Sequence, residues 1–171
     1  MTTARFLSAW LLAGCLVGCA VRPPTSEQAL AELIEDAAAG RAHPGRYQNV
    51  DPVDDASIRR FLHVEEWLDV NAEAVTEVRP APVPREGAHR FTVSADGRVT
   101  YLISLGWPGP QVRSRVLRPA PGSTITLLGW PDRLSWEQLG AVCVIATPPE
   151  MVDEENHPCR QAFVFRVEAP R

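Results

Sequence analysis

The sequence predicts an α+β protein in which an N-terminal helical segment is followed by an antiparallel β-sandwich or small barrel. Near the start of the chain, apolar residues recur three to four positions apart, which is the spacing of one helix face. From His89 onward they alternate with polar residues, as they do in strands. Short apolar segments bounded by Gly or Pro then follow closely, which is typical of sandwiches and small barrels.

The first helix is expected over residues 26–39. Thr25 and Gln28 have the spacing of a capping box, in which each side chain binds the backbone of the other residue. Gly40 favours termination. The apolar face consists of Leu30, Leu33, Ile34, Ala37 and Ala38.

A second helix is expected from Ser57 to about Leu68. It follows a loop over residues 41–53, and either Asp54 or Asp55 supplies its cap. Residues 72–79 either extend this helix or form a short strand.

A proline-rich segment, Pro80-Ala81-Pro82-Val83-Pro84, separates the helical pattern from the strand pattern. Proline favours an extended backbone and lacks the N–H donor that sheets use. We therefore expect a helical segment over residues 25–79, a spacer over 80–87 and an antiparallel β domain over 88–171.

Within the β domain, Ala95-Asp96-Gly97 predicts a hairpin between two alternating segments. The apolar segment Ala141–Ala146 is expected to be a central strand, and Pro131 to Leu139 one or two helical turns. Further strands are expected at Val112–Leu117, Thr124–Leu128 and Gln161–Val167.

The first residues carry a secretion-like pattern. Arg5 precedes an apolar run from Phe6 to Val17 that is shorter than the ~20 residues needed to span a bilayer. The run ends in two similar tetrapeptides, Leu12-Ala13-Gly14-Cys15 and Leu16-Val17-Gly18-Cys19. This pattern resembles the lipobox of bacterial lipoproteins.

The resemblance implies that residues 1–18 are a removed signal peptide and that residues 19–24 form a tether. Cys19, or alternatively Cys15, would carry the lipid and contact the membrane. Residue Ala20 after Cys19 favours the periplasmic face of the outer membrane in proteins with this signal, and palmitate is an expected modification.

Two further thiols, Cys143 and Cys159, are expected in the mature chain. In an oxidising compartment they predict a disulfide bond. Two free buried thiols are one alternative. The other is a metal site that joins Cys159 to Glu154, Glu155 and His157, although the paired spacing of zinc sites is missing.

Charge and composition disfavour several functions. All 17 basic residues are Arg, and 21 acidic residues give a net charge of −4. Without a basic cluster, the chain is not expected to bind nucleic acid. Without any Lys, it has no lysine-containing phosphate loop, and we expect no cofactor.

No catalytic motif is visible around the histidines, which are His43, His63, His89 and His157. His63 beside Glu65 and Glu66 is expected to lie on a solvated helix face. Asp51, Asp54 and Asp55 lack the other ligands of a calcium loop. Asp132 and Glu137 flank Trp136, and carboxylates beside an aromatic ring are a weak pattern of a carbohydrate site.

Two identical tetrapeptides, Leu105-Gly106-Trp107-Pro108 and Leu128-Gly129-Trp130-Pro131, are expected to close two strands at the same end of the sheet. Trp107 and Trp130 would then either anchor a partner there or fold back to cover the end of the sandwich.

Three functions follow as hypotheses. The first is a lipid-anchored, non-catalytic accessory subunit that binds another envelope protein. The second is a small cell-wall hydrolase or a carbohydrate-binding lipoprotein, and the third is an inhibitor or immunity lipoprotein. The sequence inclines towards a protein that is not an enzyme.

Overall fold

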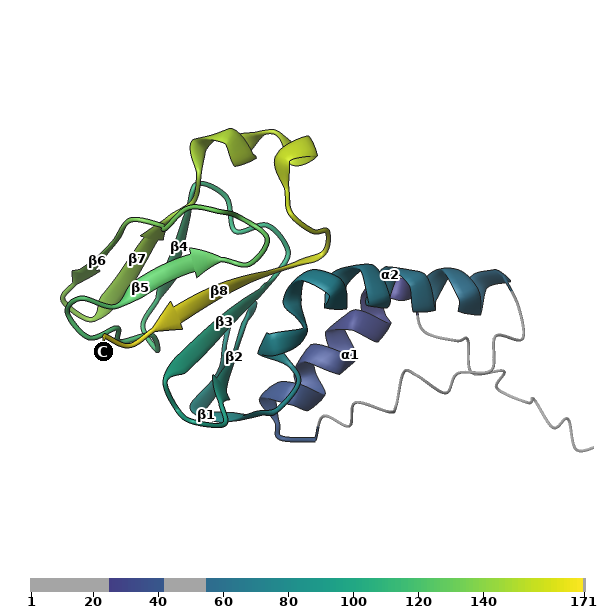
Figure 1. Ribbon diagram of the computed structural model, residues 1–171, viewed down its shortest axis with the longest axis horizontal. Helices are drawn as coiled ribbons and strands as arrows, with labels where there is room; N and C mark the ends of the chain where they lie inside the picture. Colours follow the sequence, from purple (N-terminus) through teal and green to yellow (C-terminus); the bar gives the residue numbers. More distant parts are fainter. Residues whose placement is uncertain (1–24, 42–54, 171) are drawn as a thin grey trace, which may run out of the picture.

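The computed structural model describes residues 25–41 and 55–170. Two helices, α1 (Ser26–Ala38) and α2 (Asp55–Asn71), precede a sandwich of two antiparallel sheets, which confirms the predicted α+β fold class (Figure 1). The larger sheet has the order β1-β2-β3-β8-β5 and the smaller β4-β7-β6. The strands are β1 (Val78–Glu86), β2 (His89–Ser94), β3 (Val99–Leu105), β4 (Gln111–Ser114), β5 (Thr124–Leu127), β6 (Trp136–Leu139), β7 (Val142–Ala146) and β8 (Ala162–Glu168).

The helices cover one face of the larger sheet, and the smaller sheet covers the other face (Figure 1). The alternation along β3 explains this arrangement, because neighbouring side chains of a strand point to opposite faces. Tyr101 and Ile103 pack in the core beneath the helices, whereas Leu102 packs in the core between the sheets. In the same way, Val164 and Phe165 of β8 belong to opposite cores.

Helix α1 begins as its sequence predicts. The Gln28 backbone N–H donates to Thr25 Oγ1 at 3.3 Å, and the Thr25 N–H donates to Gln28 Oε1 at 2.8 Å, which completes the capping box. Leu30 and Ile34 are buried against the sheet. Helix α2 is tied to β8 because Trp67 Nε1 donates to the Ala162 carbonyl at 2.8 Å.

The proline-rich segment is not a spacer, which corrects the expectation for residues 80–87. Residues through Glu86 belong to β1, at the edge of the larger sheet, where the missing proline donors are tolerated. The helical segment also contacts this strand directly. The Glu35 carboxylate of α1 pairs with Arg85 of β1, at 2.5 Å, and with Arg90 of β2.

Most of the remaining expected strands are present, including the hairpin at Asp96, β5 and a central β7 in the smaller sheet. The helical turns expected from Pro131 to Leu139 are wrong. Residues 136–139 instead form β6, which pairs with β7, and Leu134 N–H donates to the Ile125 carbonyl at 2.8 Å. Between α2 and β1 lies a 3-10 turn, η1 (Ala72–Ala74). No helix in the described ranges is long and apolar enough to cross a membrane.

Candidate functional site

A polar groove lies beside Trp107, where the segment before β8 faces the two helices. Two 3-10 turns, η2 (Pro149–Val152) and η3 (Glu154–Asn156), lead into this segment and project from the sandwich near the start of β8 (Figure 1). The groove has a volume of about 600 Å³. It is lined by Glu27, His63, Trp107, Glu154, Glu155, His157, Arg160, Gln161 and Phe163.

Three aromatic rings form one wall of this Trp107 groove. The Trp107 and His157 ring centroids are 4.4 Å apart, and those of Trp107 and Phe163 are 4.9 Å apart with the rings at 68°. His157 is oriented through Nε2, which lies 2.9 Å from the Met151 carbonyl oxygen. The wall is therefore apolar and held in place by mutual ring contacts.

The rest of the groove is charged. Its exposed charged residues are Glu27, Glu154, Glu155 and Arg160. Their carboxylate and guanidinium groups are therefore free to contact a bound molecule without a change in side-chain burial. A smaller hollow of about 250 Å³ adjoins the groove and adds Glu66, which lies 3.7 Å from His63 Nδ1. Carboxylates outnumber guanidinium groups, and the groove therefore favours neutral over acidic ligands.

The backbone before β8 is held by close contacts rather than by regular pairing. Gln161 adopts a positive φ of 72°, and its carbonyl accepts the Gly106 N–H at 2.6 Å. From the other side, Gly129 approaches so closely that a Cβ there would lie 2.6 Å from Pro158 Cβ and 2.9 Å from Val70 Cγ1. The two Leu-Gly-Trp-Pro turns thus both support the segment that carries His157.

The predicted aromatic turns do lie at the same end of the larger sheet, because β3 and β5 both run antiparallel to β8. Trp107 and Trp130 are partly buried and pack against the core between the sheets. Trp107 lines the groove, whereas Trp130 is not among its lining residues. A partner-binding role for the pair stays a prediction.

The residues of the weak carbohydrate-site pattern, Asp132, Trp136 and Glu137, do not line this groove. Asp132 and Glu137 are exposed, and Trp136 Nε1 donates to the Ser123 carbonyl at 3.1 Å. His63 and His157 do meet at the groove, although their sequence spacing gave no sign of it. His89 lies in β2, where burial lowers its pKa. Asp55 begins α2, while His43, Asp51 and Asp54 lie outside the described residues.

The predicted disulfide bond is wrong, because Cys143 and Cys159 are free thiols with different neighbours. Cys143 is buried in β7 between the sheets. Cys159 Sγ donates instead to the Ala162 carbonyl at 3.0 Å, and burial raises its pKa to about 11. Within residues 25–41 and 55–170, no group of three or more His, Cys, Asp or Glu side chains is placed to hold a metal ion. The metal alternative at Cys159 therefore finds no support.

No family model matches the chain. Curated relatives nevertheless exist among sugar hydrolases. An alpha-L-fucosidase of Branchiostoma floridae is 29% identical over 128 residues, which cover 70% of this chain and 28% of the relative. The tissue alpha-L-fucosidase of Bos taurus is 31% identical over 114 residues, covering 63% of this chain and 23% of the relative. The chain thus spans about a quarter of the length of these relatives.

Solved structures lead to the same group of proteins. The Thermotoga maritima alpha-fucosidase in complex with fucose superposes on 84% of this chain with a TM-score of 0.63 at 18% identity. A GH29 alpha-L-fucosidase of Bacteroides thetaiotaomicron superposes on 86% with a TM-score of 0.60 at 11% identity. The match spans 34% and 33% of those chains, respectively. At these identities the likeness shows a shared fold.

These comparisons overturn the first functional hypothesis. The relatives are alpha-L-fucosidases, so the prediction of a non-catalytic accessory subunit of an envelope assembly is wrong, and the carbohydrate-related alternative fits the findings better. The descriptions as lipoprotein, outer-membrane protein and palmitate carrier are likewise unsupported by these relatives. Cys15 and Cys19 lie outside the described residues, and lipidation there was expected from the sequence alone.

Proposed function

We propose that this chain is a carbohydrate-binding domain related to alpha-L-fucosidases, and that the Trp107 groove binds a neutral, fucose-containing glycan. The observation that carries the proposal is the combination of an aromatic wall with exposed carboxylates and a guanidinium group in one groove. The similarity to alpha-L-fucosidases supports the choice of sugar.

The groove suits a sugar for physical reasons. A sugar ring presents apolar C–H faces, which pack on aromatic rings, and hydroxyl groups, which donate to carboxylates and accept from guanidinium groups. L-Fucose also carries a methyl group on C5 in place of a hydroxymethyl group. Trp107 supplies an apolar contact for this methyl group, with the buried Phe163 ring packed against Trp107. The volume of about 600 Å³ lies within the usual range of small-molecule sites.

We assign binding rather than bond cleavage to this chain. Glycoside hydrolysis generally uses two carboxyl groups, one of which is an acid with a raised pKa. The chain spans only about a quarter of the length of the alpha-L-fucosidases that it resembles. Glu86 and Asp96, which lie outside the groove, have lowered pKa values, the opposite of what a general acid needs. In Glu86 the raising effect of burial is outweighed by hydrogen bonds from Ser114 and from the Arg115 N–H.

Calorimetric titration with L-fucose and with a fucosylated trisaccharide tests this proposal. L-Galactose is the matched ligand, because it differs from L-fucose only by a hydroxyl at C6. Losing the contact of about one methyl group should weaken binding roughly fourfold. Equal affinity for both sugars would contradict the methyl contact, and absence of saturable binding of any fucoside would overturn the proposal.

Substitutions locate the site. Glu155→Gln and Arg160→Gln change exposed groove residues and should each lower affinity roughly threefold to tenfold, which is the effect of one hydrogen bond. Glu137→Gln, on an exposed position of β6 outside the groove, is the control and should bind as the parent does. The same preparations should release no nitrophenol from 4-nitrophenyl α-L-fucoside, and steady release that Glu155→Gln abolishes would show catalysis instead.

A further inference from the structure

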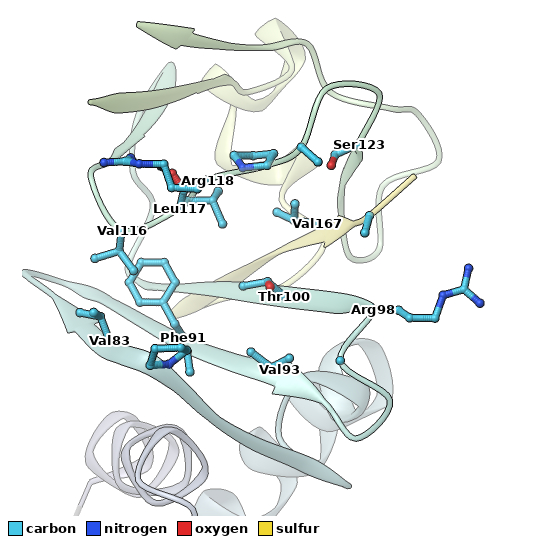
Figure 2. A pocket seen from close by; sticks show the side chains of 16 residues that line it. Val83, Phe91, Val93, Arg98, Thr100, Val116, Leu117, Arg118, Ser123 and Val167 are labelled. Carbon is cyan, nitrogen blue, oxygen red and sulfur yellow. Dashed lines mark hydrogen bonds between the residues drawn. The ribbon is translucent and has the colours of Figure 1, made fainter. Parts of the chain in front are cut away.

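A second pocket, named here the inter-sheet pocket, opens between the larger sheet and the connection from β4 to β5. It lies at the end of β3 and β8 opposite the Trp107 groove. The groove lies by Trp107 and Phe163, whereas this inter-sheet pocket lies by Arg98, Thr100 and Val167. Its volume is about 360 Å³. Figure 2 shows the side chains that line it. The two hollows share no lining residue.

The proline-rich part of β1 creates this pocket. Pro80 pairs with Thr92 and Arg85 with Arg90, so that the four residues 81–84 oppose Phe91 alone. Such a bulge bends the strand away from its partner. Ala81 still packs in the core, whereas Val83 is 48% exposed at the pocket rim. Residues of this proline-rich segment therefore line one side of the pocket, and the connection from β4 to β5 lines the facing side.

The interior of the pocket is mainly apolar. Phe91 and Val93 of β2 line one side, with Leu117 across from them and Val167 of β8 beyond, as Figure 2 shows. Thr100 and Ser123 add hydroxyl groups. An apolar cavity of this size with a few polar groups has the usual make-up of a small-molecule site.

The charge at the rim is of one sign. Arg98 and Arg118 line the pocket from opposite sides, and no Asp or Glu is among its lining residues. In Figure 2 both side chains point away from the cavity, and Arg118 Nη1 donates to the Leu117 carbonyl at 3.0 Å. Both arginines are exposed and long enough to turn towards a ligand at the mouth. This local positive charge is unusual in a chain whose net charge is −4. It contrasts with the excess of carboxylates in the Trp107 groove.

We propose that the inter-sheet pocket is a second ligand site, which takes one free amphiphilic molecule with an apolar body and a single carboxylate end. The apolar body lies against Phe91, Val93 and Leu117, and the carboxylate meets Arg98 or Arg118 at the rim. An acidic sugar fits less well, because its ring would bring several hydroxyl groups against an interior with only two partners for them, Thr100 and Ser123.

Octanoate, below the concentration at which it forms micelles, is the probe for this site. We expect saturable one-to-one binding by calorimetry, with amide shifts in NMR spectra at Thr100 and Ser123. Octylamine has the same chain with the opposite charge and should bind at least about tenfold more weakly. Absence of saturable octanoate binding, or equal binding of the amine, would overturn the proposal. So would binding to anionic phosphatidylglycerol vesicles without binding of monomeric octanoate.

A double variant tests the rim. Arg98→Glu with Arg118→Glu should lower octanoate affinity about tenfold, because two exposed charges become repulsive. Arg113→Glu, on an exposed position of β4 outside the pocket, is the matched control and should leave affinity unchanged. Glu155→Gln in the Trp107 groove should leave octanoate affinity unchanged. Fucoside binding and octanoate binding are thus measured separately, and loss of one does not imply loss of the other. Unchanged affinity in the double variant would contradict the assigned role of the arginines.

Discussion

Replacing Gly129 with alanine tests the contact that holds the groove segment in place. The glycine has a φ of 79°, where an L-residue is strained by about 1–2 kcal/mol. Its new Cβ would also lie 2.6 Å from Pro158 and 2.9 Å from Val70, closer than packed carbon atoms lie. Overpacking of this kind costs about 1–3 kcal/mol. The two effects predict a total loss of about 2–5 kcal/mol in the free energy of unfolding.

Urea denaturation followed by tryptophan fluorescence measures this loss. Gly109→Ala is the matched control, because Gly109 has nearly the same φ, 81°, and no atom within 4 Å of its ideal Cβ position. The control should lose only the strain of about 1–2 kcal/mol. Thermal melting should follow, at about 2–4 °C for each kcal/mol in a chain of this size.

Equal losses in Gly129→Ala and Gly109→Ala would refute the reasoning, since they would show that no close contact exists at Gly129. The substitution also carries a functional consequence. Pro158 follows His157 directly, so displacing it should disturb the aromatic wall and weaken fucoside binding beyond any effect of Gly109→Ala.

Four further results are expected. Trp67→Phe should lower the free energy of unfolding by about 0.5–1.5 kcal/mol, because the buried Ala162 carbonyl loses the indole donor and keeps only the weaker Cys159 thiol donor; an unchanged urea midpoint would contradict this. Cys143 and Cys159 should both be alkylated only after unfolding, and a mass lower by two hydrogens in unreduced protein would show a disulfide instead. Because the pKa of Cys159 rises from 9.0 to about 11, its contribution to stability should be intact below pH 9.0 and lost as the pH rises through about 11. Thr25→Ala should cost about 1 kcal/mol through the lost helix cap, and unchanged stability would contradict the role of the capping box.

Local sequence patterns predicted the elements that depend on local contacts. The capping box at Thr25 binds residues three positions apart, and the Ser94 hydroxyl bonds Asp96 within one hairpin. The alternation that places Leu102 and Tyr101 on opposite faces is likewise a property of the strand itself. The fold class follows from these elements, because the larger sheet carries apolar side chains on both faces. Each face must therefore be covered, one by the helices and the other by the smaller sheet.

Elements that depend on distant partners were missed. Three prolines made residues 80–84 look like a spacer, but they belong to β1, which pairs with β2. Ion pairs from Arg85 of β1 and Arg90 of β2 to Glu35 then join this edge of the sheet to α1. Residues 136–139 carry no alternating apolar pattern. They form a strand because β7 offers them a free edge. Neither partner is visible from the segment itself.

The candidate site was missed for the same reason. Its residues come from the start of α1, the middle of α2, the turn after β3 and the segment before β8. In the sequence, Trp107 was singled out as part of one of two repeated turns, and His63 as part of a solvated helix face. Glu154, Glu155 and His157 were read as a loop with weak metal-binding character, because their relation to Trp107 appears only when β3 and β8 pair.

The two identical tetrapeptides show why a repeated sequence does not give a repeated role. Gly106 and Gly129 both have positive φ values, 100° and 79°. The Trp130 N–H donates to the Leu127 carbonyl within the second turn, whereas the Gly106 N–H donates to the distant Gln161 carbonyl. Their surroundings differ, because nothing lies within 4 Å of an ideal Cβ at Gly106, whereas Gly129 is pressed against Pro158. The first turn therefore contributes its tryptophan to the groove, and the second contributes its glycine to the segment that carries His157. The repeated sequence supplies a glycine with a positive φ at both positions, and the neighbouring strands and helix determine the role of each tetrapeptide.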